Sequence, residues 1–321
     1  HSREWVATML QRARRDALKG KREVIVGAGY KGKRFIFEKA KKLGVEIVLV
    51  DKRTPFVEEL LRDGLIAELI ETDNSKPKEA LAGAKRKLLR SARKNGKLDG
   101  ITTFWEDDVP LTADLAQALG LPYHTQSAAK SVRSKAETRA VMEKAGLPTP
   151  RNRKISLPVK IGAGDAAYEK AVSAARAQFV KDLEHVGYPA VLKPAFGAAA
   201  LGVKKVTNRA EAMAAFDEVR AVVTPEVDPI FAQGADLVLE QYLDGREYDV
   251  DVMMRGGKPL FVSVTDNWPT REPYFLATGS SLPSRLLNAK EQKEAGDLAI
   301  KTAQALGLTD GVVHIEGKYT K

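Results

Sequence analysis

The stretch AVLKPAFGAAALGVKKV, residues 190–206, says most about the fold and the ligand of this chain. An apolar run ends at Lys193, a loop of small residues follows, and a second β-like run over 203–206 closes a predicted hairpin. Alanine and glycine let a backbone come close to a ligand, so N–H groups of such a loop can surround phosphate oxygens. Lys193 supplies a point charge for the same phosphates. No Gly-Lys-Ser/Thr follows, so this is not a Walker loop; an ordinary hairpin is the alternative.

Composition limits the class of protein. The 321 residues are 44% hydrophobic, enough for two or three domains with buried cores. No apolar run approaches the roughly 18 residues of a membrane span, so we expect no membrane contact. The absence of cysteine excludes disulfides, thiolate metal sites and a cysteine nucleophile. The net charge of +10, concentrated in residues 12–42 and 76–97, favours solvated helix faces over nucleic-acid binding and suits an enzyme that handles anions.

The pattern of helices and strands predicts an α/β protein. In the first half they alternate, which indicates a Rossmann-like open parallel sheet with helices on both faces. The expected strands there are 23–26, 45–50 and 100–105, and the expected helices are 3–19, 33–43, 56–63, 76–95 and 111–119. The second half predicts an α+β arrangement. Beyond the hairpin its expected strands are 237–242, 245–254, 260–264 and 311–316. Its expected helices are 136–145, 168–185, 211–219 and 291–306. A loop is expected at 160–168, and it leads into the helix that begins at residue 168.

A glycine-rich turn, GAGYKG at residues 27–32, lies between a predicted strand and a predicted helix, and Asp51 ends the next strand. This is the dinucleotide fingerprint, with the acid placed for a ribose hydroxyl, so an NAD(P)-binding protein is one alternative function. The same glycines serve any tight strand–helix turn, and no hydride chemistry is visible downstream. We therefore favour a scaffold turn.

A row of acids follows the segment EQYL, residues 240–243. That segment can offer a carboxylate and backbone groups to an adenine edge, and Glu247 lies at a suitable spacing for a ribose diol. Glu247, Asp249 and Asp251 share one face of a predicted strand by two-residue alternation. Acids in such a row repel one another, so a cationic or hydroxyl-bearing partner is expected there. The alternative is a solvent-facing strand.

The last predicted strand offers a metal ligand. His314 and Glu316 alternate onto one of its faces. Mg²⁺ prefers one or two carboxylates together with phosphate oxygens, so Glu316 is a candidate ligand. A purely structural glutamate is the alternative.

Together these pieces resemble the ATP-grasp superfamily over most of the chain. The resemblance implies that ATP and Mg²⁺ bind: two lysines contact phosphates, the E-x-x-L segment borders adenine, the next glutamate binds ribose, and a late acid ligates the metal. The implied ATP-binding residues are Lys135, Lys193, Phe196, Gly197, Ala198, Ala199, Ala200, Gly202, Glu240, Gln241, Tyr242, Leu243 and Glu247, and the implied metal ligand is Glu316. The first half resembles the family's pre-grasp domain, whose glycine turn usually binds no dinucleotide.

Residues 266–273 and 311–320 resemble the branch that contains carnosine synthase and L-amino acid ligases. This branch implies a carboxylate–amine ligase that forms an amide or dipeptide bond through an acyl phosphate, from small substrates such as amino acids. Lys193 and Arg271 are the expected catalytic residues, with Arg271 holding a substrate carboxylate. The acids at 106–107 are candidates for contact with the substrate amine. For Arg271 and for these two acids, a surface salt bridge is the alternative role. For the whole protein, a biotin-carboxylase-type enzyme is a further alternative, which the segment 266–273 does not favour.

The resemblance also divides the chain into a Rossmann-like pre-ATP-grasp domain (1–125), an ATP-grasp subdomain with the phosphate-covering hairpin (126–243) and a C-terminal ATP-grasp subdomain (244–321). The family continues with a strand bearing a second acidic metal ligand, an asparagine and an arginine, so an incomplete C-terminal part is expected, and a nucleotide-binding module without turnover stays an alternative. The chain begins with histidine, so a missing native N-terminus is expected. We expect a cytoplasmic protein, and a homo-oligomer is compatible with the sequence.

Overall fold

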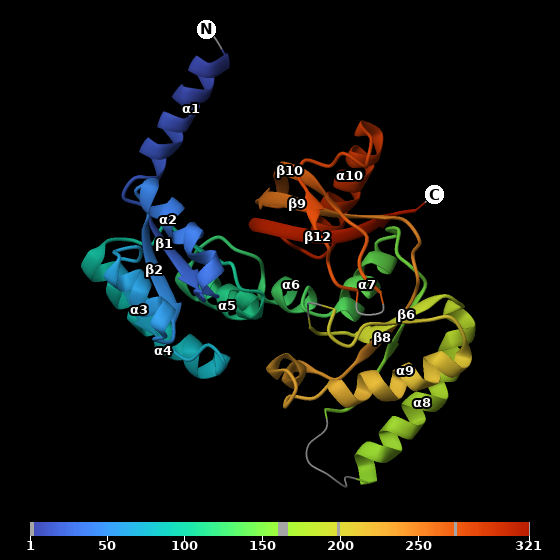
Figure 1. Ribbon diagram of the computed structural model, residues 1–321. Helices are drawn as coiled ribbons and strands as arrows, with labels where there is room; N and C mark the ends of the chain where they lie inside the picture. Colours follow the sequence, from blue (N-terminus) through green and yellow to red (C-terminus); the bar gives the residue numbers. More distant parts are fainter. Residues whose placement is uncertain (1–2, 160–165, 198–199, 273–274, 321) are drawn as a thin grey trace. The chain divides into compact units, whose positions relative to one another are not determined.

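The structure is a computed structural model that describes residues 3–159, 166–197, 200–272 and 275–320. The chain divides into two compact units, residues 1–129 and 130–321. In the described residues, the first unit contains one sheet and the second contains two (Figure 1). Each unit has its own apolar core.

The first unit is built on a parallel sheet with strand order β3-β2-β1-β4. The strands are β1 (Arg22–Val26), β2 (Glu46–Asp51), β3 (Glu68–Glu71) and β4 (Gly100–Thr103). The helices are α1 (Arg3–Leu18), α2 (Arg34–Lys42), α3 (Pro55–Arg62), α4 (Pro77–Asn95) and α5 (Val109–Leu119), with 3₁₀ turns at Lys31–Lys33 and Glu106–Asp108. Alternate residues of β1 and β2 enter two apolar clusters, one with α4 and α5 and one with α2 and α3. Both faces of the sheet are therefore buried, which explains the continuous apolar runs of its central strands.

The second unit contains two antiparallel sheets. The first has the order β5-β8-β6-β7, and α8 and α9 pack on it to form the main core. Its strands are β5 (Asn152–Ile155), β6 (Ala190–Pro194), β7 (Lys204–Val206) and β8 (Leu237–Gln241). Its helices are α7 (Lys135–Lys144), α8 (Ala166–Val186) and α9 (Arg209–Val222), with a 3₁₀ turn at Pro229–Gln233. Helix α6 (Gln126–Ser131) spans the boundary between the units.

The second sheet has the order β11-β10-β9-β12, and α10 (Ala289–Ala305) packs on one of its faces. Its strands are β9 (Arg246–Arg255), β10 (Lys258–Asn267), β11 (Ser280–Ser281) and β12 (Gly311–Tyr319). Along β9, Val250, Val252 and Met254 are buried. The acids Asp249 and Asp251 alternate with them and therefore occupy the opposite face of the sheet.

The predicted fold class, α/β with an α+β second half, is confirmed. Three strands were not predicted: β3, β5 and β11. All three lie at the edges of their sheets and are short, so they lack the apolar run or alternation that identifies a central strand. The predicted strand 100–105 ends at Thr103, whose hydroxyl accepts a hydrogen bond from the Trp105 N–H (3.0 Å) as the chain turns. Of the predicted loop at 160–168, residues 160–165 lie outside the described residues, and α8 begins directly after them.

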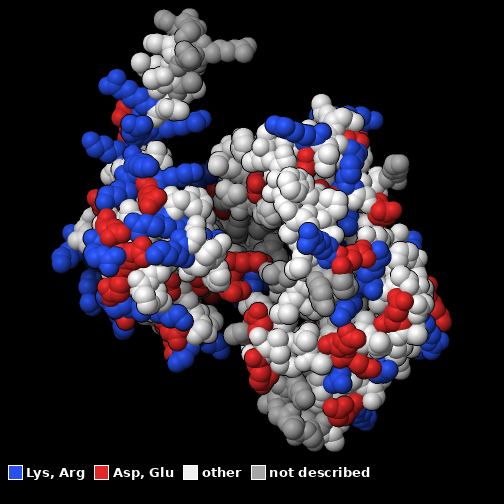
Figure 2. All heavy atoms as spheres, in the orientation of Figure 1, with Lys and Arg blue, Asp and Glu red and all other residues white. Residues whose placement is uncertain are grey.

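Basic and acidic side chains are interspersed over the visible face of the first unit (Figure 2). The basic residues of α4 line a shallow surface depression of about 370 Å³ together with Leu89. Within the described residues, no helix combines the length and the apolar character that crossing a bilayer demands.

Candidate functional site

The predicted hairpin is formed by β6 and β7, whose register pairs Ala190 with Val206. Burial alternates along β6, so Lys193 emerges on the face opposite the core residue Leu192. Strand β8 flanks β6 on its other side and carries Glu240. The strand pairing therefore brings the predicted phosphate lysine beside the first residue of the predicted adenine segment.

Three charged side chains from β6, β8 and α7 form one cluster. Glu240 is only 5% exposed. Its carboxylate accepts hydrogen bonds from Lys193 Nζ (2.7 Å) and from Arg139 Nε and Nη2 (2.7 and 3.5 Å). Burial alone would raise the pKa of Glu240, but the charges of Lys193 and Arg139 outweigh it and lower that pKa to about 2. Two cations and one carboxylate leave the cluster with a net positive charge. Sequence reasoning missed Arg139.

Lys135, at the start of α7, lies against the loop of the hairpin. Its N–H donates to the Ala195 carbonyl (2.9 Å), and its ammonium donates to the Gly197 carbonyl (2.7 Å). The Ser134 hydroxyl caps this end of α7 by accepting from the Glu137 N–H (3.3 Å). The cap and the backbone contact fix the first turn of α7, so the predicted first lysine is brought to the loop of the hairpin.

The loop itself has a fixed base. Phe196 packs, partly buried, against the core of the second unit, which makes it an anchor of the loop. Positive φ angles occur at Gly197 (108°), Ala200 (57°) and Gly202 (71°), so the backbone follows a path that favours small residues. The two alanines at 198–199 lie outside the described residues.

The EQYL segment lies where the two sheets of the second unit meet. Gln241 ends β8, and Leu243 follows it half-buried. The Tyr242 ring has Lys205 Nζ of β7 at 4.2 Å and Lys318 Nζ of β12 at 5.1 Å from its centroid. Cations at these distances are attracted by the ring quadrupole. Tyr242 thus links the hairpin to the last strand.

Two ion pairs extend this link. Glu247, the predicted ribose ligand, is the register partner of Lys318, and their charged atoms lie 3.5 Å apart. Lys205 pairs with Glu272 (2.9 Å), which belongs to the segment after β10. The hairpin, the end of β8 and the edge of the second sheet are therefore held together by charges.

A cluster of possible metal ligands lies on the face of the second sheet opposite α10. The register places Glu316 directly opposite Asp249 and His314 opposite Asp251. One ligand atom from each of Asp249, His314 and Glu316 lies within 4.8 Å of the others. His314 Nδ1 is 2.9 Å from an Asp251 oxygen, and its Nε2 is 3.7 Å from an Asp249 oxygen. Burial lowers the pKa of His314, but these acids outweigh it and the net shift is upward.

The donor set fits a divalent cation. Asp249 Oδ1 is buried without a hydrogen-bond partner, which is costly for a carboxylate oxygen. Burial also raises the pKa of Asp249. Asp249 and Glu316 directly opposite one another repel, and a hard cation would relieve both problems through its preference for oxygen ligands.

Arg271, a predicted catalytic residue, is exposed, and its backbone forms a bridge with Leu276 (2.9 and 3.2 Å). Among the described residues its side chain forms no hydrogen bond or ion pair. The structure does not bring Arg271 into contact with the cluster around Glu240 or with the acids of β9 and β12.

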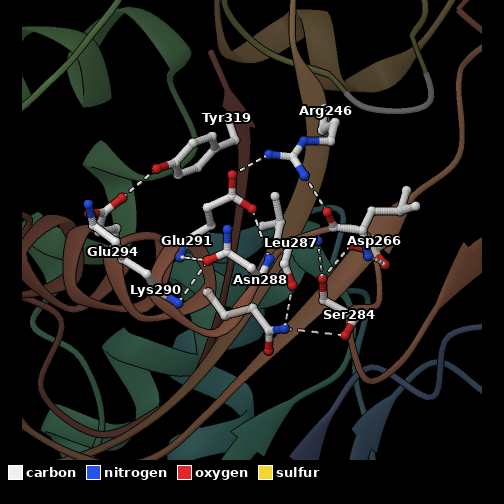
Figure 3. A network of polar contacts seen from close by, with 11 residues as sticks. Arg246, Asp266, Ser284, Leu287, Asn288, Lys290, Glu291, Glu294 and Tyr319 are labelled. Atoms are coloured by element: carbon white, nitrogen blue, oxygen red, sulfur yellow. Dashed lines mark hydrogen bonds and ion pairs between the residues drawn. The ribbon is translucent and has the colours of Figure 1, made fainter. Parts of the chain in front are cut away.

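Asp266, which opens the segment resembling the amino acid ligases, is a structural residue. It is 1% exposed and accepts hydrogen bonds from the Ser284 hydroxyl and the Arg285 and Leu286 N–H groups (2.5, 2.5 and 2.9 Å). Arg246 donates to the Leu286 carbonyl and to Glu291 on α10, as Figure 3 shows. This network fixes both ends of the segment between β10 and α10, so Asp266 positions the chain around Arg271.

The glycine turn of the first unit is occupied by the protein's own acids. Asp51 accepts from the Ala28 and Lys52 N–H groups (both 2.7 Å). Gly27 has φ 79°, and a Cβ there would collide with the carboxylate of Asp108. Burial, and then the charge of Asp51, raise the pKa of Asp108 to about 7. Two carboxylates behind this turn disfavour a pyrophosphate, which supports the scaffold interpretation. The exposed acids at 106–107 lie in the 3₁₀ turn just before Asp108.

Comparisons with known proteins agree with this architecture. Residues 186–321 match the family model of the ATP-grasp domain, and residues 37–123 match that of the ATP-grasp N-terminal domain. The chain therefore carries an ATP-grasp domain preceded by an ATP-grasp N-terminal domain, and the predicted resemblance to the ATP-grasp superfamily is confirmed.

Within the superfamily the likeness to L-amino acid ligases is also confirmed. Human carnosine synthase 1 is 30% identical over 321 residues, 98% of this chain and 37% of that protein. The alanine–anticapsin ligase of Bacillus subtilis is 24% identical over 262 residues, covering 78% of this chain and 50% of that protein. The crystal structure of an L-amino acid ligase from Bacillus licheniformis superposes with a TM-score of 0.66 at 22% identity, covering 94% of this chain and 64% of that one. The chain spans about 37% of the length of the human relative.

Proposed function

We propose that the chain is the nucleotide-binding part of an ATP-dependent carboxylate–amine ligase that forms amide or dipeptide bonds from amino acid-like substrates. The observation that carries this proposal is Tyr242, contacted by Lys205 of the hairpin and by Lys318 of β12. Tyr242 joins the hairpin, which carries the lysines, to β12, the strand that carries part of the acidic cluster.

In this proposal Lys193 and Lys135 hold ATP phosphates, together with backbone N–H groups of the 196–202 loop. Backbone groups of residues 241–243 take the adenine edge, and Glu247 takes the ribose. Glu240 acts through Lys193 and not through the adenine, because its carboxylate is buried between two cations.

Glu316 and Asp249 would hold Mg²⁺ through their carboxylate oxygens, with His314 beside them. When bound, the metal would neutralise phosphate charge and orient the terminal phosphoryl group. The 1–125, 126–243 and 244–321 division of the chain into pre-grasp domain and two ATP-grasp subdomains is part of the same proposal.

The proposed chemistry has two steps. A substrate carboxylate oxygen attacks the γ-phosphorus of ATP, giving an acyl phosphate and ADP. The amine of the second substrate then attacks the carbonyl carbon, phosphate leaves, the amine loses a proton, and an amide remains. Phosphoryl transfer needs positioning and charge neutralisation, which the lysines and the loop supply. The small-residue loop would exclude water from the acyl phosphate. Arg271 is proposed to hold a substrate carboxylate.

The first test is a titration with Mg-ATP and, separately, with NADH. We expect only Mg-ATP to bind and to raise the melting temperature. Lys193→Met, which keeps most of the aliphatic stem, should weaken Mg-ATP by roughly 1.5–3 kcal/mol, the scale of a hydrogen bond to a charged group. Unchanged affinity in the folded variant would remove Lys193 from the site, and binding of NADH alone would replace the proposal with a dinucleotide site.

The second test concerns turnover. A protein that includes the sequence following Lys321 is incubated with ATP and pairs of amino acids, and ADP and peptide products are measured. ADP released only when both substrates are present supports the ligase. Tight Mg-ATP binding without ADP release from any pair would support a nucleotide-binding module without turnover.

A further inference from the structure

We propose that Arg139 is a positioning residue that neutralises Glu240 and thereby leaves the Lys193 ammonium available to a polyphosphate. The inference rests on the proposed function and adds to it a residue that neither the motif order nor the comparisons assign.

Arg139 and Lys193 share Glu240. The Arg139 guanidinium contacts both carboxylate oxygens, at 2.7 Å through Nε and 3.5 Å through Nη2, and Lys193 Nζ lies 2.7 Å from one of them. A planar guanidinium that spans a carboxylate holds it in a fixed orientation. Arg139 Nη1 also lies 3.8 Å from the Met142 sulfur, one turn further along α7. The Arg139 head group is therefore fixed on its helix.

Helix α7 delivers both basic residues to the hairpin. Lys135 and Arg139 are four residues apart and thus neighbours on one face of the helix. Lys135 holds the loop through the Gly197 carbonyl, and Arg139 holds Glu240 beneath Lys193. One helix turn thus sets the position of the loop and the charge balance of the strand lysine.

The charge balance determines what Lys193 can do. With Lys193 as its sole partner, the buried carboxylate would form a closed neutral pair, and a phosphate could recruit the lysine only by leaving Glu240 unpaired. An unpaired buried charge is strongly destabilising. With Arg139 in place Glu240 keeps its partner, and Lys193, whose side chain is 18% exposed, can turn to an anion. The cluster then presents one net positive charge to the ligand.

The test compares Mg-ATP with adenosine, which lacks phosphates. Arg139→Met should weaken Mg-ATP at least about tenfold, because Lys193 could then reach a phosphate only by leaving the buried Glu240 carboxylate unpaired. Adenosine affinity should change by less than about twofold, because adenosine has no phosphate that recruits Lys193. Arg139→Lys keeps the charge but loses the planar fork, so it should weaken Mg-ATP less than Arg139→Met does.

A double-mutant cycle of Arg139 and Glu240 supplies the decisive measurement. In Arg139→Met/Glu240→Gln the buried carboxylate is gone as well, so Mg-ATP affinity should return to within about threefold of Glu240→Gln alone. The matched control is Arg176→Met, which breaks an arginine–aspartate pair with Asp217 (2.5 and 2.6 Å) between α8 and α9 and should leave both ligands unaffected. If Arg139→Met alone does not fold, the double variant and Arg139→Lys still test the proposal.

Three results would overturn the inference. They are a wild-type affinity for Mg-ATP in Arg139→Met, equal losses of affinity for Mg-ATP and adenosine in that variant, or a Mg-ATP affinity of the double variant well below that of Glu240→Gln. The first two would mean that Arg139 is dispensable or merely holds the fold. Failure of the wild-type protein to bind Mg-ATP would instead refute the proposed function, and this inference with it.

Discussion

Glu23→Gln should stabilise the first unit at pH 8 and leave it nearly unchanged at pH 5. Glu23 lies on β1 opposite Gly100 of β4, and a Cβ on Gly100 would collide with the Glu23 carboxylate. Burial, and then the nearby charge of Asp99, raise the pKa of Glu23 from 4.5 to about 7. The carboxyl group is thus easier to ionise in the unfolded chain than in the folded one.

The sign and size follow from proton linkage. Between pH 4.5 and about 7 the folded state binds more protons than the unfolded state, so stability falls as pH rises through this window. A difference of about 2.5 units at about 1.36 kcal/mol each gives a loss of ~3 kcal/mol, complete above pH ~7. Glutamine has nearly the same shape and cannot ionise, so the variant escapes this loss. Its advantage over wild type should therefore appear only at the higher pH.

The assay is urea unfolding at pH 5 and pH 8 in a Trp268→Phe background, in which the remaining tryptophans, Trp5 and Trp105, both belong to the first unit. The exposed Glu79 provides the control: Glu79→Gln should change stability equally at both pH values. A Glu23→Gln advantage of the same size at pH 5 and pH 8, or no advantage at either, would refute the assigned pKa and the burial argument behind it.

Three further changes test the second unit, and a fourth, on α4 of the first unit, serves as a comparison. Glu240 has the opposite linkage, since its pKa is lowered to about 2: wild type should lose stability as pH falls from 4.5 towards 2, and Glu240→Gln should flatten that slope in acid unfolding followed by circular dichroism. Asp266→Ala leaves two N–H groups and a hydroxyl unpaired and should lower the free energy of unfolding in urea by ~3 kcal/mol. A decrease below ~1 kcal/mol would contradict the assigned hydrogen-bond network. Gly317→Ala places a Cβ 2.6 Å from a tyrosine ring atom on β9 and should cost ~1–3 kcal/mol, whereas Gly83→Ala, with open space around it on α4, should be neutral or stabilising by up to ~1 kcal/mol.

The parts of the fold that sequence could predict are those where burial imposes a period. Strands β1 and β2 are buried on both faces and read as apolar runs, and β9 alternates because one face packs on α10. The polar β5, which gives Ile155 to the apolar core, and the two-residue β11 pair with a neighbouring strand but have no apolar run or alternation of their own. Backbone hydrogen bonds do not depend on the type of side chain, so such strands cannot be predicted from the residue pattern of a single sequence.

The candidate site was predictable as an order of residues but not as a set of contacts. Glu240 was assigned to an adenine edge because of its place in the EQYL segment. The structure pairs it with Lys193, since β8 and β6 are neighbours although the hairpin loop, β7 and α9 lie between them in the sequence. Arg139 was overlooked because it belongs to no motif. Its four-residue spacing from Lys135 was the only available signal, and it becomes informative only once α7 is known to face the hairpin.

The acidic row on β9 shows what the alternation of residues can predict and what it cannot. Alternation predicted that Glu247, Asp249 and Asp251 share a face and need a cationic or hydroxyl-bearing partner. The register of β12 decides which of them has one: Lys318 lies opposite Glu247 and His314 opposite Asp251, but Asp249 meets Glu316, another acid. Lys318 and His314 thus offset the charges at both ends of the row, whereas the middle acid faces another carboxylate, with His314 Nε2 3.7 Å away. A shift of β12 by two residues would set Lys318 against Asp249 while preserving every buried position, so the register, and not the alternation, creates the candidate cation site.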